Sequence, residues 1–235
     1  MPSLPHYTIF PLGDSAATID FGNTIDISIN NQVLGLFNFL DRSFMPGVIE
    51  LVPAYSSLTI YYDTPTVRRN FPHHNSAFEA AKEQIEQKIK LPHPASASSS
   101  RLVRIPVCYD EEFGTDATDL IRVKGISKED LVRIHTSKNY AVYMLGFLPG
   151  FTYMGKVDEQ IAVPRKINPV RVEAGSVGIA GFQTGIYPMV SPGGWQIIGR
   201  TPLRLFNPVS EELTLLRPGD DVQFYSISRD EYNRY

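Results

Sequence analysis

The second half of the chain alternates short β-type runs with glycine and proline corners, and this pattern restricts the fold more than any other feature. From Tyr140 onward, apolar residues no longer recur at the 3.6-residue period of a helix. The runs are YAVYML, SVGIA, GIYPMV, WQIIG, LRLF and DVQFYSI, and the corners between them include PG at 149–150, PGG at 192–194 and RPGD at 217–220. Many short strands joined by tight turns are typical of a closed or nearly closed β-barrel. We therefore expect this region to form a mainly β domain.

Three elements are expected between this region and the preceding linker. The run RLVRIPVCY, which begins at Arg101, predicts a strand. Two short helices should follow it. One runs from about Asp116 to Lys124 and ends at Gly125, and the other runs from Lys128 to Thr136 with Ser127 as its N-cap.

The segment LPHPASASSS, residues 91–100, reads as an exposed linker. Two prolines and a Ser/Ala run cannot build a hydrophobic core. The predicted organisation is a small α+β domain over residues 1–92, a linker over residues 93–101, and the mainly β domain over residues 102–235.

The region before the linker has the pattern of an α+β domain. Strands are predicted at YTIFP, ATIDF, VIELVP and SLTIYYD. Asp26 can cap a helix whose apolar residues share one face, namely Ile29, Val33, Leu36, Phe37 and Leu40. Ser76 and Glu79 form a capping-box signature that opens a second helix, with an apolar stripe of Phe78, Ala81, Ile85 and Ile89. The expected order is ββαββα, and an antiparallel sheet with both helices on one face would bury both stripes.

Charge and composition exclude several functional classes. Of 235 residues, 22 are Lys or Arg and 25 are Asp or Glu, so the formal net charge is −3 and no basic excess indicates nucleic acid or an anionic membrane. No apolar run reaches the roughly 20 residues that a membrane-spanning helix needs. The single cysteine, Cys108, cannot form an internal disulfide, and the first residues lack the pattern of a secretory signal. We expect a cytoplasmic protein whose partners are small molecules or proteins.

Two glycine-containing stretches come close to nucleotide-binding motifs without matching them. GFTYMGKV at 150–157 follows G-x-x-x-x-G-K-[ST] except at its last position, where Val157 has no hydroxyl for Mg²⁺. Pro164 also comes too soon for the long helix that should face the phosphates. GSVGIAG at 175–181 has the spacing G-x-x-G-x-x-G, and we interpret it as a β-corner rather than a dinucleotide site.

The histidines and the cysteine do not form a metal-site pattern. His135 lies near a helix end, where an interaction with terminal carbonyls is the main interpretation and a catalytic base is the alternative. His73 and His74 are adjacent and would point in different directions, so we expect no protein-held metal. Cys108 lies in an apolar strand and is interpreted as a small core residue.

The region from Gly146 to Arg204 concentrates polar and aromatic residues that a purely structural barrel would not require. Three arginines could bind carboxylate or phosphate through paired hydrogen bonds: Arg165, Arg171 and Arg200. Donors to a carbonyl could come from Gln183, Tyr187 and Ser191, and a pocket wall from Phe147, Phe151, Tyr153 and Trp195. Alternatively, the glycines serve corners, the aromatic residues fill the barrel and the arginines lie on the surface. For the group as a whole we favour a binding site.

The same region carries a long resemblance to a known family. The run MLGFLPGFTYMG, the pair Pro164-Arg165 and the run AGSVGIAGFQTGIYPMVSPGGWQIIGRTPLRLF resemble the signature of the family that comprises KipI, the B subunits of 5-oxoprolinase and subunit 1 of allophanate hydrolase. Similarity extends through GDSA, PGVIELVPAYSSL, IPVCYDEEFGTD and RPGDDVQF, so it covers nearly the whole chain. Where the family usually has Pro-Arg twice, this chain has Val170 after the second proline, so no role is assigned to Arg171.

The resemblance implies a small α+β domain followed by a cyclophilin-like β-barrel, in one subunit of an ATP-dependent 5-oxoprolinase. Such a complex uses ATP with Mg²⁺ to open 5-oxoproline to glutamate, and it includes a KipA-like subunit and a LamB/YcsF-like subunit. A five-membered lactam resists hydrolysis, and phosphorylation of its carbonyl oxygen creates a leaving group that lets water attack. The isolated chain is expected to be inactive.

With this reaction in view, contacts to substrate or phosphate are predicted for Arg165, Gln183, Tyr187, Ser191, Trp195 and Arg200. His135 is a secondary candidate for proton transfer. Two other functions stay open. The chain could inhibit a sensor histidine kinase, as some family members do, or belong to a biotin-dependent carboxyltransferase, although it has no biotin-carrying Met-Lys-Met motif. Prolyl isomerase activity would follow from the barrel fold alone, and the Phe-His-Arg cluster of active cyclophilins is not found in the sequence.

Overall fold

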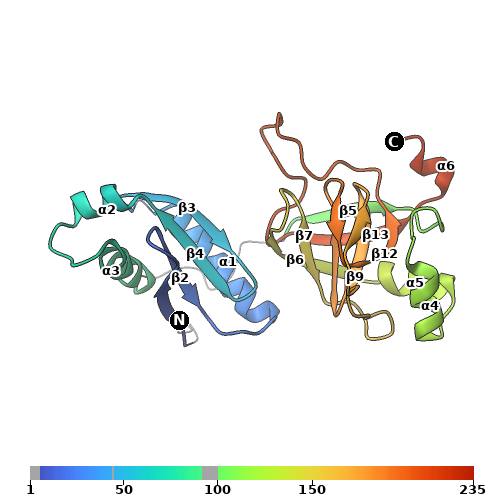
Figure 1. The fold of residues 1–235 in the computed structure, drawn as a ribbon, viewed down its shortest axis with the longest axis horizontal. Coiled ribbons are helices and arrows are strands. Elements are labelled where there is room, and N and C mark those ends of the chain that lie inside the picture. The colour runs from blue at the N-terminus through green and yellow to red at the C-terminus, as the bar shows by residue number, and fades with distance from the viewer. Residues whose placement is uncertain (1–5, 44, 92–99) are drawn as a thin grey trace. The chain divides into compact units, whose positions relative to one another are not determined.

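The computed structural model describes residues 6–43, 45–91 and 100–235. The chain divides into two compact units, Met1–Ser99 and Ser100–Tyr235, and each is described by itself (Figure 1). Most of the expected linker, residues 92–99, lies outside the described residues.

The first unit contains a four-stranded antiparallel sheet in the order β1-β2-β4-β3. Its strands are β1 Thr8–Pro11, β2 Ala16–Asp20, β3 Val48–Pro53 and β4 Ser57–Tyr62. Its helices are α1 Ile27–Asp41, α2 Thr64–Asn70 and α3 Ala77–Ile89. The element order is therefore ββαββαα.

Alternate residues of the two central strands point into one hydrophobic core. Ala17 lies opposite Ile60, and Ile19 lies opposite Leu58, in the β2–β4 register. All four side chains are buried in a cluster that also holds the apolar stripes of the helices. Because successive side chains of a strand point to opposite faces, the helices cover the face that carries these four residues.

The helix caps of this unit follow the sequence pattern with two differences. Asp26 caps α1 as predicted, since its carboxylate accepts hydrogen bonds from the backbone of the first turn. Ser76 caps α3, but the Glu79 carboxylate accepts from the backbone N–H of Asn75 rather than that of Ser76, so the capping box is incomplete. Helix α2 was not predicted, because its seven residues are too few to show a periodic stripe.

The second unit contains a seven-stranded sheet in the order β12-β9-β10-β7-β6-β13-β5. Among these described strands, only the β13–β5 pair is parallel. The strands are β5 Leu102–Val107, β6 Asn139–Leu145, β7 Thr152–Gly155, β9 Ser176–Ala180, β10 Gln183–Ile186, β12 Gln196–Arg200 and β13 Asp221–Ser226. A separate ribbon pairs β8 Val170–Val172 with β11 Ser191–Gly193. The helices are α4 Ala117–Lys124, α5 Lys128–Thr136 and α6 Arg229–Tyr232.

The two edges of the seven-stranded sheet meet each other. Cys108 follows β5, and it exchanges two backbone hydrogen bonds of 2.9 Å with Arg200 at the end of β12. All seven strands contribute to one buried core, so the sheet curls around its own apolar face (Figure 1). Cys108 is fully buried, and burial is the main reason that the pKa of its thiol is raised. The prediction of a small core cysteine is confirmed.

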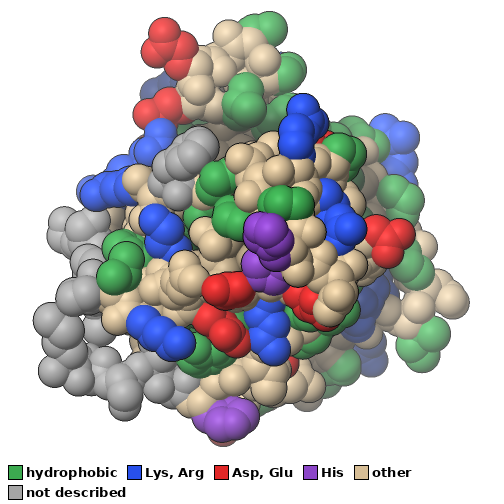
Figure 2. All heavy atoms as spheres, turned by 90° about the vertical axis from the view of Figure 1, so that its left-hand side faces the viewer, with side chains coloured by type: hydrophobic (Ala, Val, Ile, Leu, Met, Phe, Trp, Pro, Cys, Tyr) green, Lys and Arg blue, Asp and Glu red, His purple; other side chains and the backbone are tan. Residues whose placement is uncertain are grey.

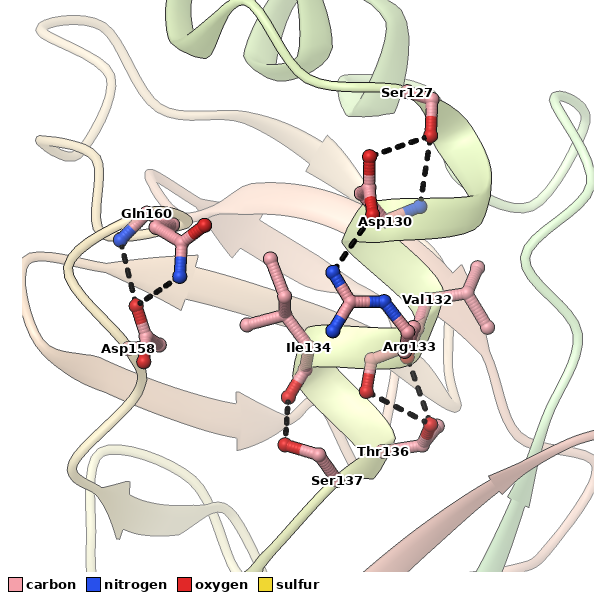
Figure 3. A network of polar contacts seen from close by, with 9 residues as sticks. All are labelled: Ser127, Asp130, Val132, Arg133, Ile134, Thr136, Ser137, Asp158 and Gln160. Atoms are coloured by element: carbon pink, nitrogen blue, oxygen red, sulfur yellow. Dashed lines mark hydrogen bonds and ion pairs between the residues drawn. The ribbon is translucent and has the colours of Figure 1, made fainter.

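Helix α5 has the predicted bounds and N-cap, and α4 begins at Ala117, one residue after its predicted start, and ends as predicted. Helix α4 ends at Gly125, whose φ of 64° is the left-handed conformation that glycine adopts without strain. At the start of α5, the Ser127 hydroxyl accepts from the N–H of Asp130, and the Asp130 carboxylate pairs with Arg133 at 2.7 Å (Figure 3).

One prediction about the last third of the chain is wrong, and one element there was not predicted. Residues 203–206 form no strand, because the N–H of Leu203 bonds to the Thr201 hydroxyl and an isolated bridge joins Phe206 to Thr214. Helix α6 was not expected, since a four-residue helix leaves no periodic pattern. Its capping box, Ser228 with Glu231, was the available signal.

Surface charge agrees with the sequence composition. On the face that carries α2 and α3, basic and acidic side chains are interspersed with hydrophobic ones (Figure 2). Among the described residues, no helix has both the length and the apolar character to cross a bilayer.

Candidate functional site

A pocket of about 340 Å³ lies on the side of the second unit's sheet that faces away from the barrel core. Met154 of β7 points into the core, so its neighbour Tyr153 points the other way, into the pocket. The lining residues are Phe147, Leu148, Phe151, Tyr153, Arg165, Pro169, Tyr187, Ser191, Pro192, Gly193, Gly194 and Trp195.

Two glycines make room for the floor of this pocket. Gly178 of β9 and Gly185 of β10 are direct partners across the two strands. A Cβ at Gly178 would lie 3.0 Å from Cβ of Trp195, and one at Gly185 would lie 2.9 Å from its indole ring. The missing side chains therefore leave a bare patch of sheet, and the indole of Trp195 packs on it.

Phe151 is the centre of the aromatic wall. Its ring centroid lies 4.9 Å from those of Tyr153 and Tyr187 and 5.3 Å from that of Trp195, with the rings tilted edge to face. Phe151 itself is only 1% exposed. Such edge-to-face pairs add to the stability of the wall beyond the area they bury.

The turn between β6 and β7 places a strained aromatic residue at the pocket. Phe147 has a φ of 67°, a conformation that residues with a side chain rarely adopt. The N–H of Leu148 bonds to the carbonyl of Gly146 across it, at 2.8 Å. The Phe147 ring is 62% exposed and contacts Phe151 edge to face. Backbone strain of this kind is concentrated at functional sites.

The Gly193-Gly194 pair separates the two largest polar groups of the pocket. A Cβ at Gly193 would lie 2.6 Å from the Tyr187 hydroxyl, and one at Gly194 would lie 3.1 Å from Nη2 of Arg165. Burial raises the pKa of Tyr187, while the nearby N–H groups of Trp195 and Gly194 act in the opposite direction. At neutral pH the Tyr187 hydroxyl therefore keeps its proton and can donate it to a ligand.

The backbone on both sides of Arg165 is fixed to the segment that carries Trp195. The carbonyl of Pro164 accepts from the side chain of Gln196 at 3.1 Å, and the N–H of Lys166 donates to the carbonyl of Gly194 at 2.6 Å. The loop is thus held one residue before and one residue after Arg165.

A half-buried ion pair also holds this loop. Lys166 Nζ lies 2.6 Å from Asp116 Oδ2, and both side chains are only 17% exposed. The same carboxylate oxygen accepts from the N–H of Ile197 at 2.7 Å. Asp116 is the N-cap residue of α4 but makes no side-chain capping bond, because its carboxylate is used for these two contacts. The sequence predicted Asp116 only as a helix start and did not reveal this role.

Two polar groups of the pocket have no partner within the described residues. The Ser191 hydroxyl is buried, with the residue 8% exposed, and makes no hydrogen bond. The Arg165 guanidinium makes no hydrogen bond or ion pair with any described residue. An unpaired buried hydroxyl costs about 1–3 kcal/mol, so a ligand that bonds to it recovers part of that cost.

His135 lies elsewhere, fully buried among the residues of the barrel core. Its ring stacks on Phe224 at 4.6 Å and on Tyr140 at 5.4 Å. Nδ1 lies 2.7 Å from the Tyr109 hydroxyl, and Nε2 lies 3.0 Å from the Thr184 hydroxyl. The helix-end carbonyls that were expected to contact the ring are not its partners. Instead, the carbonyl of His135 itself accepts from the Tyr140 hydroxyl.

The hydrogen-bond chain around His135 determines its protonation. The Thr184 hydroxyl donates its only proton to the carbonyl of Gly178 at 3.1 Å, so it must accept a hydrogen bond from Nε2 of the ring. Nδ1 then accepts from the Tyr109 hydroxyl. Burial lowers the pKa of His135 to about 3 and raises that of Tyr109 well above its ordinary value. His135 is therefore a neutral, fully bonded core residue that no substrate touches in this conformation.

The structure thus brings together four of the predicted site residues, namely Arg165, Tyr187, Ser191 and Trp195, with the three other predicted wall residues, Phe147, Phe151 and Tyr153. Gln183 is half-buried on β10 and does not line the pocket. Arg200 also lies outside it, with its guanidinium 5.4 Å from the ring centroid of Phe113. Arg171 is exposed and pairs with Glu173 at 2.9 Å.

The two near-motifs have structural explanations. Residues 152–155 of GFTYMGKV form strand β7, so this stretch is not a phosphate-binding loop. GSVGIAG contains β9 and ends at Gly181, which has a φ of 59° at the corner before β10, as predicted. His74 of the adjacent histidine pair lies 2.6 Å from Glu83. Within residues 6–43, 45–91 and 100–235, no three His, Cys, Asp or Glu side chains gather as a metal site.

Known proteins resemble this chain along nearly its whole length. The family model described as carboxyltransferase domain, subdomain C and D, matches residues 7–216. The 5-oxoprolinase B subunit of Bacillus subtilis (strain 168) is 44% identical over 231 residues, which cover 97% of this chain and 96% of that protein. The Escherichia coli O157:H7 protein of the same name is 36% identical over 216 residues, 91% of this chain and 93% of its own length. The crystal structure of TTHA0988 gives a TM-score of 0.77 at 34% identity and covers 91% of this chain and 40% of that chain.

Proposed function

Since the chain belongs to the family of carboxyltransferase subdomains C and D, together with the 5-oxoprolinase B subunits, we propose that it is the B subunit of an ATP-dependent 5-oxoprolinase. In this proposal, the complex opens the lactam of 5-oxoproline to give glutamate. The chain supplies the pocket that contains Arg165, Tyr187, Ser191 and Trp195.

One observation carries the proposal beyond the family relationship. The Ser191 hydroxyl is buried without a partner, in a pocket where the unpaired Arg165 is the only charged residue among the described lining residues. The cost of an unpaired buried atom applies to the Ser191 hydroxyl, whereas Arg165 is exposed and can bond to water. A buried hydroxyl without a partner beside an exposed guanidinium, in an aromatic pocket, is typical of a binding site for a small polar ligand.

The pocket residues suit distinct parts of 5-oxoproline. The guanidinium of Arg165 can hold the carboxylate, and the hydroxyls of Tyr187 and Ser191 can donate to the lactam carbonyl. The Trp195 ring can pack against the five-membered ring. Fixing the substrate in this way would hold the carbonyl oxygen in place for phosphoryl transfer, which depends chiefly on positioning and charge stabilisation.

ATP with Mg²⁺ would supply the phosphoryl group, and its site is part of the proposal for the complex rather than for this pocket. The stretch nearest to a phosphate loop is β7, so the described residues offer no cradle of that type. A KipA-like subunit and a LamB/YcsF-like subunit are the proposed partners, and the complex is proposed to be cytoplasmic.

The proposal is tested by reconstitution with these two partner subunits. We expect phosphate release that requires ATP, 5-oxoproline and all three subunits, and none from this chain alone. Ser191→Ala should raise KM for 5-oxoproline about fivefold, the loss of one hydrogen bond. It should not lower the melting temperature, because the hydroxyl removed is unpaired in the free protein.

Ser210→Ala is the matched control, since Ser210 lies outside the pocket lining. Its KM should equal that of the wild-type complex. Turnover by the isolated chain, or a complete complex that leaves 5-oxoproline intact, would contradict the proposed function.

A further inference from the structure

We infer that this pocket is a complete recognition site for a small ring carboxylate, that Arg165 selects the carboxylate, and that the chain binds such a ligand without its partner subunits or ATP. The inference rests on the proposed function and deepens it, because it names the group that is recognised and the residue that recognises it.

The charge of the pocket indicates a ligand with a single negative charge. Lys166, next to Arg165, is neutralised by its ion pair with Asp116. Arg165 has no such partner in the described part of the chain, and no Asp or Glu of that part lines the pocket. One free guanidinium therefore faces the ligand. Its planar fork of donors matches one carboxylate through two parallel hydrogen bonds.

The backbone of the loop that carries Arg165 is fixed before any ligand binds. Hydrogen bonds from Gln196 to Pro164 and from Lys166 to Gly194 hold the backbone on both sides of it. The Asp116–Lys166 ion pair holds the loop a third time, and Asp116 makes no side-chain capping bond to α4. An ordered loop loses little entropy on binding, so no partner subunit is required to bring the exposed Arg165 side chain to the pocket.

The size and wall of the pocket indicate a compact, flat ligand. Its volume of about 340 Å³ is at the low end of the range for small-molecule sites, which suits a single ring rather than a nucleotide. Gly178 and Gly185 seat the Trp195 indole against the sheet, and Phe151 and Tyr153 hold it edge to face. One ring face can then pack against this wall while Ser191 bonds to a polar ring atom.

Trp195 makes the inference directly measurable, because it is the only tryptophan of the chain. Its intrinsic fluorescence reports on the pocket without a label. The isolated full-length chain is titrated with three compounds. These are L-5-oxoproline, 2-pyrrolidone, which lacks the carboxylate, and L-proline, which lacks the lactam carbonyl.

We expect saturable binding of L-5-oxoproline and affinity about thirtyfold lower for 2-pyrrolidone, the value of one charge-assisted paired contact. Arg165→Gln should lower the affinity for L-5-oxoproline to that for 2-pyrrolidone and leave the latter unchanged. Arg165→Lys keeps the charge and should recover only part of the loss. Arg171→Gln is the control, because it makes the same change of charge at an exposed arginine that pairs with Glu173.

Equal affinity for L-5-oxoproline and 2-pyrrolidone would overturn the inference, as would unchanged binding in Arg165→Gln. If the reconstituted complex opens 5-oxoproline but the isolated chain does not bind it, the inference fails and the proposed function stands. If the chain binds ring carboxylates through Arg165 but the complex does not open 5-oxoproline, the proposed function fails instead.

Discussion

Strand β10 places two very different polar regions on its two faces. Thr184 points into the barrel core, where it bonds to His135, and Gly185 points outward, where it leaves room for Trp195. Around His135 every polar atom has a partner, whereas in the pocket Ser191 and Arg165 have none among the described residues. Both regions combine aromatic rings with polar side chains. The regions also differ in exposure, since His135 is fully buried and Arg165 is exposed. An unpaired buried atom alone does not mark a site, because Thr152 Oγ1 and Arg200 Nε are buried and unpaired outside the pocket.

The largest effect on stability is expected from removing His135, the centre of the fully hydrogen-bonded cluster. His135→Ala deletes a fully buried ring and leaves the Tyr109 and Thr184 hydroxyls without their partner. We expect the free energy of unfolding to fall by about 4 kcal/mol, measured by urea denaturation. His73→Ala, at an exposed position, should change it by less than about 0.5 kcal/mol.

Turnover of the reconstituted complex tests the alternative role of His135 as a proton-transfer residue. If His135→Ala keeps its stability but abolishes turnover of the reconstituted complex, the residue transfers protons and the comparison between the two regions is wrong.

The second effect is a dependence of stability on pH. Because the pKa of His135 is lowered to about 3 in the folded chain, the unfolded chain binds a proton below about pH 6.5 while the folded chain does not. The contribution of neutral His135 to the free energy of unfolding is therefore full above pH 6.5, and it is lost as the pH falls toward 3. At pH 4.5 the loss should be about 2.5 kcal/mol.

Carboxylates also titrate in this range, so the difference between wild type and His135→Gln isolates the histidine. Urea denaturation at pH 7, 5.5 and 4.5 should give a steeper loss for the wild type. Identical slopes for the two proteins would show that His135 is not buried in its neutral form.

The smallest effect is expected at Arg200, which belongs to neither region. Its side chain lies over the Phe113 ring, and its backbone closes the barrel against Cys108. Arg200→Lys keeps the backbone contacts and a positive charge near the ring. It should cost about 0.5–1 kcal/mol of stability and leave kcat/KM of the complex within about twofold.

A thirtyfold loss of kcat/KM in Arg200→Lys, without a change in melting temperature, would mean that the substrate site extends to Arg200 in the assembled complex. That result would agree with the sequence analysis, which predicted a contact of Arg200 with substrate or phosphate.

Much of the local structure could be predicted from the sequence. Helices α1 and α5 begin at their predicted caps, because a capping side chain acts on backbone N–H groups within a few residues. The corners on both sides of β9 were likewise recognised from Gly175 and Gly181, whereas the corner predicted at 192–194 is largely strand β11, Ser191–Gly193. Helix α2 and residues 203–206 were not predicted correctly, since short helices leave no periodic pattern and a local hydroxyl bond replaced the strand ladder at Leu203.

The sequence by itself also determined which residue types were available for a site, and it indicated the family through motifs that span both units. It did not determine which of those residues meet. Trp195 lies in the pocket because the sheet register sets Gly178 opposite Gly185 and leaves a bare patch for its indole. Ser191 reaches the pocket through the β8–β11 ribbon, and Arg165 through the bond between Lys166 and Gly194.

His135 had the residue type of a catalytic base, but α5 places it inside the barrel. The position of His135 and the grouping of the pocket residues depend on contacts between distant segments and on which face of a strand points to the core. Burial of apolar surface over the whole domain determines these contacts and faces, and a local sequence pattern does not show them.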